Sequence, residues 1–209
     1  MTAKNLLNQK LVEQLASIPF SNGHGAGKKE LGLGLIYYFI PYIYRARTCV
    51  CLGSGGGFVP ALMRQAQRDL QLSESRTFLV DAIMPEKGFG GPCGTNGWLE
   101  TTAFFQRQYP EIDIISSTTK EVGEKFFRKN PVKIDYLHVD ADHSAEMVEQ
   151  DIKTFWDLLK PAAIVSFHDS NLQSVEIGIR KGLEGKNFVQ MIKLSEIGAG
   201  LTIIRKLEK

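Results

Sequence analysis

Three titratable side chains, Asp140, Asp142 and His143, follow an apolar run near the middle of the chain. The run, IDYLHVD, is typical of a buried strand, so these side chains lie where the strand ends. Carboxylates and an imidazole at one point can hold a divalent cation or move a proton. For Asp142 and Ser144 we favour a structural role, because both can cap a helix that begins at Ala145.

A second polar pair, His168 and Asp169, ends another apolar run, AAIVSF. Parallel strands of one sheet end at the same edge, so we expect Asp140, His168 and Asp169 to converge there. Oxygen ligands suit Mg²⁺, whereas a histidine leaves Mn²⁺ or Fe²⁺ open. We predict a metal site formed by these three residues, with a structural turn as the alternative. His143 could instead act as a general base, and His138 is expected to be a hydrogen-bonded core histidine.

A glycine-rich turn, LGSGGGF, follows the apolar run TCVCL and precedes a helical pattern. Gly53, Gly55 and Gly57 allow a sharp turn and a close approach of the backbone to a ligand. A dinucleotide fingerprint needs a small residue where this chain has Phe58. Asp81, at the end of the next apolar run, can accept ribose hydroxyls and fits NAD and S-adenosylmethionine equally. The pattern predicts a nucleotide-type site and leaves the cofactor open.

Apolar runs alternate with helical patterns from residue 48 onward, and two further runs close the chain as a hairpin. The strands are expected at 48–52, 77–81, 112–116, 134–140, 162–167, 188–194 and 200–207. The helices between them are expected at 60–70, 99–109, 120–129, 144–159 and 174–185. This order predicts an α/β fold: a doubly wound, mostly parallel, seven-stranded Rossmann-like sheet with a C-terminal antiparallel hairpin.

The residues before the first strand carry no motif of their own. Helices are expected at 5–16 and 30–45, with a glycine-rich loop between them. We therefore expect 1–47 to form a helical cap or substrate segment and 48–209 to form a cofactor-binding catalytic domain, in a single compact domain overall.

The composition is that of an ordinary soluble globular protein. The chain has 209 residues, 43% of them hydrophobic and 23% charged, with a formal net charge of +2. The mixed charges indicate neither a nucleic-acid nor a membrane partner. The three cysteines form no CxxC pair and the N-terminus lacks the apolar core of a signal peptide, so we expect a cytoplasmic protein. The expected partner is a small molecule, and a homo-oligomer is compatible with the sequence.

Four segments together resemble the successive motifs of class I S-adenosylmethionine-dependent methyltransferases: CVCLGSGGGF, TFLVD, IDYLHVDADHS and LLKPAAIVSFHDS. Within that class the chain is similar to the small macrocin-type O-methyltransferase family. The signature of that family is a D-x-D-H-S turn after the fourth strand and an HD pair after the fifth. The resemblance covers about residues 48–170. It departs from the family at Pro161-Ala162-Ala163, where Pro-Gly-Gly is usual, and this changes a turn rather than the chemistry.

The resemblance implies a role for each motif. Asp81 would bind the ribose hydroxyls of the cofactor, and Asp140 would lie near the sulfonium. Further cofactor contacts would come from Gly53, Ser54, Gly55 and Gly57 at the methionine and ribose, Ala82 and Ile83 beside the adenine, and Ser117 at the adenine edge. The layout of Asp140, His168 and Asp169 is similar to that of metal-dependent catechol-type O-methyltransferases.

We therefore predict an S-adenosylmethionine-dependent methyltransferase that acts on a hydroxyl of a small molecule, such as a sugar or a secondary metabolite. Proton removal would use either a divalent cation, Mg²⁺ or else Mn²⁺ or Fe²⁺, or His143 directly. A nitrogen acceptor stays open. The alternatives are an NAD-linked oxidoreductase, a metal-dependent hydrolase and a cofactor-binding module without catalysis. The loop at 84–97, with Phe89 and Trp98, is predicted to form a lid or a substrate wall.

Overall fold

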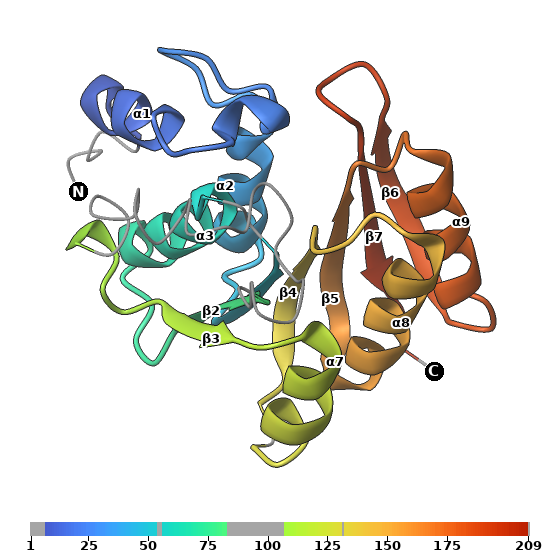
Figure 1. Ribbon diagram of the computed structural model, residues 1–209. Helices are drawn as coiled ribbons and strands as arrows, with labels where there is room; N and C mark the ends of the chain where they lie inside the picture. Colours follow the sequence, from blue (N-terminus) through green and yellow to red (C-terminus); the bar gives the residue numbers. More distant parts are fainter. Residues whose placement is uncertain (1–6, 54–55, 83–106, 131, 209) are drawn as a thin grey trace.

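The computed structural model of the chain describes residues 7–53, 56–82, 107–130 and 132–208. Its strands are β1 (Thr48–Leu52), β2 (Arg76–Asp81), β3 (Asp113–Ser116), β4 (Ile134–Val139), β5 (Leu159–His168), β6 (Phe188–Leu194) and β7 (Leu201–Lys206). They form one seven-stranded sheet in the order β3-β2-β1-β4-β5-β7-β6 (Figure 1). β1 to β5 pair in parallel, whereas β7 is antiparallel to both β5 and β6.

The central strands are apolar on both faces, as a parallel sheet covered on both sides requires. Successive side chains point to opposite faces, so Cys49 and Cys51 of β1 join one hydrophobic cluster, whereas Val50 and Leu52 join the other. Two separate cores therefore hold the sheet between two layers of helices.

The helices form a layer on each face of the sheet (Figure 1). The first layer contains α1 (Gln9–Ala16), η1 (Ser21–His24), α2 (Gly34–Ile43) and α3 (Phe58–Asp69). The second layer contains α7 (Thr119–Glu121), η3 (Val122–Phe127), α8 (Ala145–Phe155), η4 (Trp156–Leu158) and α9 (Gln173–Gly182). The predicted α/β fold, with its mostly parallel sheet and C-terminal hairpin, is confirmed.

Several element boundaries differ from the predicted ones. The helix expected at 144–159 ends at Phe155, and β5 begins at Leu159 rather than at Ala162. The strand extends because Leu159 pairs with Ile134 of β4 across an irregularity, where Ala162 takes a left-handed φ of 63°. The helix expected at 99–109 lies almost wholly outside the described residues.

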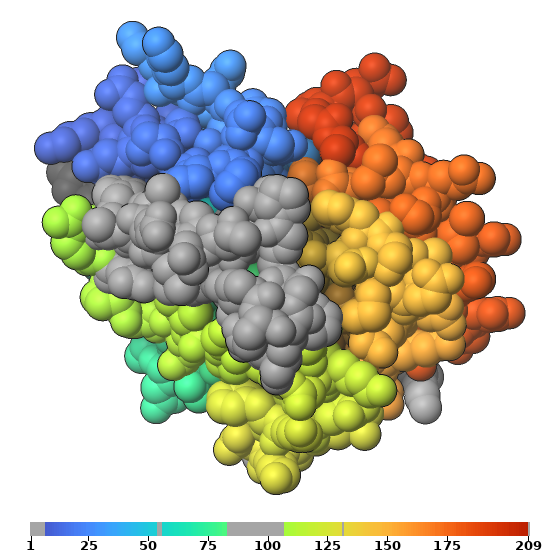
Figure 2. Space-filling view, in the orientation of Figure 1, coloured from blue at the N-terminus to red at the C-terminus, as the bar shows by residue number. Residues whose placement is uncertain are grey.

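The segment before β1 packs against α3 and forms part of the first helical layer. Leu15 and Tyr37 share one hydrophobic cluster with Phe58 of α3. The loop around Gly23 also lies beside the β6–β7 hairpin, since a Cβ at Gly198 would meet the Gly23 carbonyl oxygen at 2.9 Å. Figure 2 shows these segments meeting where the blue surface adjoins the orange and red one. The division into 1–47 and 48–209 stays a prediction.

Among the described residues, no helix combines the length and the apolar character that a membrane crossing requires.

Candidate active site

The carboxyl ends of β1, β4 and β5 meet at one edge of the sheet, and this edge carries a polar cluster. Asp140 directly follows β4, and His168 is the last residue of β5. The two strands are parallel neighbours, with Val139 opposite Phe167. The Asp140 backbone N–H donates to the Leu52 carbonyl of β1 at 2.8 Å, which holds Asp140 next to the glycine turn. Open α/β sheets bind their ligands at such an edge.

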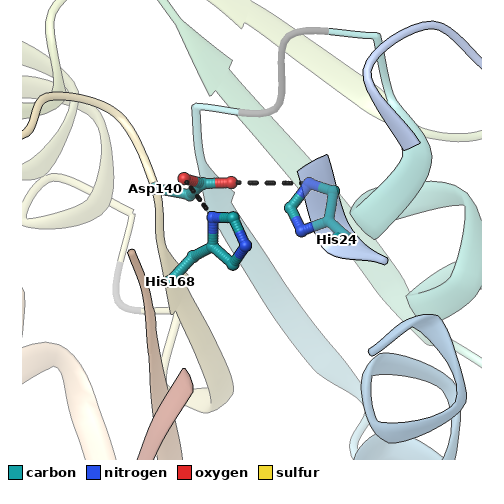
Figure 3. Close-up of side chains that lie close together, drawn as sticks. All are labelled: His24, Asp140 and His168. Atoms are coloured by element: carbon teal, nitrogen blue, oxygen red, sulfur yellow. Dashed lines mark hydrogen bonds and ion pairs between the residues drawn. The ribbon is translucent and has the colours of Figure 1, made fainter. Parts of the chain in front are cut away.

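All four histidines of the chain surround the Asp140 carboxylate. On Oδ2, the neighbours are His24 Nε2 at 3.8 Å and His138 Nε2 at 3.6 Å. On Oδ1, the neighbours are His168 Nδ1 at 3.2 Å and His143 Nε2 at 3.8 Å. Figure 3 shows the His24 and His168 rings turned toward this carboxylate from different parts of the chain. A buried carboxylate with imidazoles at both oxygens can bind a cation or move a proton.

The residues of the predicted metal site lie together. His168 Nδ1 is 3.2 Å from both Asp140 Oδ1 and Asp169 Oδ2, and His143 Nε2 is 2.7 Å from Asp169 Oδ2. Two groups therefore offer ligand atoms that lie within 4.8 Å of one another: His24, Asp140 and His168, and Asp140, His143 and Asp169. Either spacing can be spanned by one ion, and the first group is the more deeply buried.

The cluster contains an ionised carboxylate beside neutral imidazoles. Burial would raise the pKa of Asp140, yet the imidazoles of His138, His143 and His168 hold that pKa well below its usual range. Burial lowers the pKa of His24 to about 3 and also lowers that of His138, so both rings are neutral. Neutral imidazole is the form that binds metal.

His143 and His168 have pKa values that shift in the opposite direction, upward. Asp140 and Asp169 raise the pKa of His143 to about 10. Burial would lower the pKa of His168, but the same two carboxylates raise it to about 9. Both rings are therefore protonated at neutral pH in this arrangement, and a bound cation would replace the proton of His168. A base role for His143 requires that another cation neutralise these carboxylates.

Asp142 and Ser144 shape the turn after β4 rather than the cluster. The Ser144 backbone N–H donates to Asp142 Oδ1 at 2.7 Å. Ser144 is the N-cap residue of α8, but its side chain makes no capping hydrogen bond. The structural role expected for both residues is therefore carried by the Asp142 carboxylate and not by the Ser144 hydroxyl.

The glycine turn is pressed against the polar cluster. Gly53 has a left-handed φ of 71°, and a Cβ there would overlap the backbone oxygen of Asp140. Gly57 has a φ of 88° and precedes the first residue of α3. Only glycine fits such positions without strain. The start of the turn therefore lies directly against the backbone of Asp140, and its end leads into the N-terminus of α3.

The other predicted cofactor residues border this turn where they are described. The Gly53 N–H donates to the Val80 carbonyl at 2.8 Å, which places Asp81, the last residue of β2, and Ala82 beside the turn. Both residues are half-buried. Ser117 follows β3 and donates to Glu121 Oε2 at 3.0 Å. The remaining predicted contacts, Ser54, Gly55 and Ile83, lie outside the described residues, as do Phe89, Trp98 and the loop at 84–97.

His24 is the site residue that sequence reasoning missed. It ends η1 in the segment before β1 and is only 5% exposed. The available signal was its rarity, since it is one of four histidines, and its position between Gly23 and Gly25. Neither feature identifies a partner some 116 residues away in sequence, because loop position is set by tertiary packing.

His138 is only partly the satisfied core histidine that the sequence suggested. Its Nδ1 hydrogen-bonds with Ser166 Oγ at 2.8 Å. Its Nε2 is buried without a hydrogen-bond partner, and so is His168 Nε2. Buried polar atoms of this kind call for a specific explanation, such as a ligand.

Comparisons with known proteins agree with this architecture. The family model described as a methyltransferase domain matches residues 50–170, more than half of the chain. The search against curated proteins gives no match.

Three solved structures share the fold of this chain. The O-methyltransferase TomG from Streptomyces achromogenes, in complex with S-adenosylmethionine, is 14% identical with a TM-score of 0.66, and the match covers 94% of this chain and 90% of TomG. The O-methyltransferase from Bacillus cereus, in complex with S-adenosylhomocysteine, is 12% identical with a TM-score of 0.63, covering 95% and 90%. The Podospora anserina methyltransferase PaMTH1, bound to S-adenosylhomocysteine, is 14% identical with a TM-score of 0.66, covering 97% and 89%.

The family match spans the glycine turn, Asp81, Asp140 and the His168–Asp169 pair, which are the features that form the polar edge. The prediction of a methyltransferase, rather than an oxidoreductase or a hydrolase, is therefore confirmed: this chain belongs to the methyltransferase domain family.

Proposed function

We propose that the protein transfers a methyl group from S-adenosylmethionine to a hydroxyl of a small molecule. The single observation that carries this proposal is the contact between Gly53 and Asp140. It joins a cofactor-type turn to a cluster that can hold a hydroxyl and accept its proton. The structural neighbours TomG and the Bacillus cereus enzyme, both O-methyltransferases with S-adenosylmethionine or its product bound, support the cofactor and the oxygen acceptor.

The described residues fit this cofactor. Gly53 lets the turn lie directly against the Asp140 backbone, and Asp81 ends β2 next to the Val80 carbonyl that binds Gly53 N–H. We assign the ribose hydroxyls to Asp81, the methionine part to the turn, and the adenine surroundings to Ala82 and Ser117. Ser54, Gly55 and Ile83 complete this set as predictions.

The chemistry asks the protein mainly for alignment and for removal of one proton. The bound cofactor supplies a sulfonium that is already a strong methyl donor. Asp140, buried beside the turn, would orient the acceptor hydroxyl toward that group. A divalent cation held by Asp140, His168 and Asp169 would lower the pKa of the hydroxyl, and His143, half-exposed at the rim, offers the alternative route for the proton.

The proposed cellular compartment and partners of the protein rest on its composition. We propose a cytoplasmic enzyme with a small-molecule acceptor and neither nucleic acid nor membrane as a partner. The net charge of +2 and the buried thiols of Cys49 and Cys51, which form no disulfide, support this proposal. A homo-oligomer stays a prediction.

Calorimetric titration with S-adenosylhomocysteine tests the cofactor, with NADH as the control ligand. We expect micromolar binding, at least about tenfold weaker in Asp81→Ala, and no binding of NADH. Phenols and sugars are then screened as acceptors by following product formation. Loss of activity with a chelator indicates the cation route, whereas loss in His143→Ala alone indicates the base route. Failure of S-adenosylhomocysteine to bind, with or without a divalent ion, would overturn the proposal.

A further inference from the structure

We propose that the segment before β1 completes a centre for a nitrogen-preferring divalent transition ion, with His24, Asp140 and His168 as its ligands. The inference rests on the proposed use of a cation at Asp140. It adds a ligand that lies outside residues 50–170, which are the part of the chain that the methyltransferase family model matches. It also favours a transition ion such as Mn²⁺, Fe²⁺, Co²⁺ or Zn²⁺ over Mg²⁺, a choice that the sequence left open.

The spacing of the three side chains suits the ligands of one ion, although His168 Nδ1 also hydrogen-bonds with Asp140 Oδ1. His24 Nε2 is 3.8 Å from Asp140 Oδ2, which exceeds hydrogen-bond reach. His168 Nδ1 is 3.2 Å from Asp140 Oδ1, and the His24 and His168 ring centroids are 4.2 Å apart (Figure 3). Two ligand atoms that are each about 2.1 Å from one ion stand roughly 3 to 3.5 Å apart. Small shifts of these side chains therefore suffice to meet one ion.

Two buried nitrogen atoms of the same cluster have no hydrogen-bond partner among the described residues. His138 is fully buried, and its Nε2 lies 3.6 Å from Asp140 Oδ2 without a hydrogen-bond partner. His168 Nε2 is likewise buried and unpartnered. A buried polar atom without a partner costs about 1–3 kcal/mol. His138 Nε2 faces the same carboxylate oxygen as His24 Nε2, so an ion at Asp140 Oδ2, with its bound water, would give His138 a partner.

The structure holds His24 firmly in this position. Its Nδ1 hydrogen-bonds with the buried Tyr37 hydroxyl at 3.2 Å, which leaves Nε2 to face Asp140. Its carbonyl accepts from Leu33 N–H at 2.9 Å, and Gly32 is packed so closely that a Cβ would overlap the His24 and Gly25 backbones. A partner on the second ring nitrogen is what orients metal-binding histidines in proteins. Tyr37 is thus a positioning residue for His24.

The donor set decides the class of ion. Two imidazoles and one carboxylate on one side of an ion suit Fe²⁺, Mn²⁺, Co²⁺ and Zn²⁺. Mg²⁺ prefers an all-oxygen shell with several waters. The predicted trio of Asp140, His168 and Asp169 offers only one nitrogen ligand. His24 adds the second nitrogen, which shifts the preference of the site from Mg²⁺ toward transition ions.

The test titrates metal-free full-length protein with Co²⁺ or Mg²⁺ alone, by calorimetry and by the visible absorption of bound Co²⁺. We expect Co²⁺ to bind at least about tenfold more tightly than Mg²⁺. His24→Gln and His24→Ala should each weaken Co²⁺ binding by about tenfold or more and leave Mg²⁺ nearly unchanged. The control is Asn22→Ala, an exposed residue of the same η1 turn, which should bind Co²⁺ like the wild type.

Unchanged Co²⁺ affinity in a folded His24 variant, or equal affinity for Mg²⁺ and Co²⁺, would overturn the inference. X-ray absorption of Zn²⁺ bound to the wild-type protein counts imidazole ligands without any variant, so a folding defect at His24 leaves the test intact. Because every histidine of the chain belongs to the cluster, any imidazole seen comes from it. Fewer than two imidazoles refute the centre, and two or more support it when the His24 variants also lose Co²⁺ affinity.

A parallel titration with S-adenosylhomocysteine separates this inference from the proposed function. Binding of S-adenosylhomocysteine without His24-dependent Co²⁺ binding overturns the metal centre and leaves the cofactor assignment standing. His24-dependent Co²⁺ binding without S-adenosylhomocysteine binding supports the centre and overturns the cofactor assignment.

Discussion

The two ends of the parallel strands treat buried polar side chains in opposite ways. At the amino ends, Gln67 of α3 is 1% exposed and every polar atom of its amide is paired. Its Nε2 donates to the carbonyls of Ala46, Arg47 and Arg76 at 3.1 to 3.2 Å. Its Oε1 accepts from Arg64 Nη1 at 2.8 Å and from Thr77 Oγ1 at 2.9 Å.

At the carboxyl ends, the Asp140 cluster contains buried side chains that are incompletely paired. Two imidazole nitrogens, His138 Nε2 and His168 Nε2, have no hydrogen-bond partner, and nearby Ser170 Oγ has none either. Both networks tie together segments that are distant in sequence. The difference teaches that a saturated buried network stabilises the fold, whereas an unsaturated one keeps its polar atoms available for a ligand.

The largest effect is expected from Asp140→Asn, which removes the charge at the centre of the unsaturated network. We expect methyl transfer to fall by about a thousandfold, equivalent to about 4 kcal/mol, because both cation binding and acceptor orientation depend on that carboxylate. The melting temperature should fall while the protein stays folded, because the lowered pKa of Asp140 means that its ionised carboxylate stabilises the fold. Activity is measured with the acceptor found in the screen. A variant that unfolds while losing activity would make Asp140 a structural residue and break the comparison.

Gln67→Met tests the saturated network. The change keeps the volume but leaves three carbonyls and Thr77 without their shared partner, so we expect the free energy of unfolding to drop by about 3 kcal/mol. Chemical denaturation measures the loss, with the exposed Gln173→Ala as the matched control. Affinity for S-adenosylhomocysteine well below the melting temperature should match the wild type. A weakened affinity would show that the two ends of the sheet are coupled.

Gly53→Ala separates backbone strain from the close approach to Asp140. Gly185 has nearly the same φ, 69° against 71°, but open space around it, so Gly185→Ala carries the strain without the clash. We expect Gly53→Ala to weaken S-adenosylhomocysteine binding by about thirtyfold, or about 2 kcal/mol, because the turn must move away from β4. Gly185→Ala should bind normally and lose only about 1 kcal/mol of stability. Equal affinities in the two variants would count against a cofactor turn at Gly53.

The smallest effect is expected from another buried carboxylate, which has no imidazole partner. Asp151 of α8 has Thr119 Oγ1 as its hydrogen-bond donor and no imidazole beside it, so burial raises its pKa to about 7. The folded state therefore keeps a proton that the unfolded state loses above its normal pKa. This contribution to stability is complete below that pKa and is lost as the pH rises toward 7.

Between pH 5 and pH 6, Asp151 should accordingly lower the free energy of unfolding by about 1 kcal/mol. Asp151→Asn should remove this part of the pH dependence, measured by denaturant unfolding of both proteins at each pH. Parallel stability curves for wild type and variant would mean that Asp151 ionises normally in the folded protein.

Much of the site was predictable because it lies on regular elements. Asp140 and the His168–Asp169 pair follow two apolar runs, and neighbouring parallel strands must end at one edge. The glycine turn was predictable for a similar reason, since its residues require backbone angles that other residues avoid. The early start of β5 was not, because pairing of Leu159 with Ile134 across an irregularity depends on the partner strand.

The sequence by itself determined the alternation of strands and helices, the glycine turn and the polar strand ends, because these depend on local periodicity and local backbone chemistry. Only the tertiary structure decided that His24 joins Asp140. That contact needs Tyr37 and Phe58 to share a core and Gly32 to admit the His24 backbone, and none of these pairings leaves a periodic signal in the chain. Long-range packing of an irregular segment is set by the surface it meets, which the sequence of the segment does not encode alone.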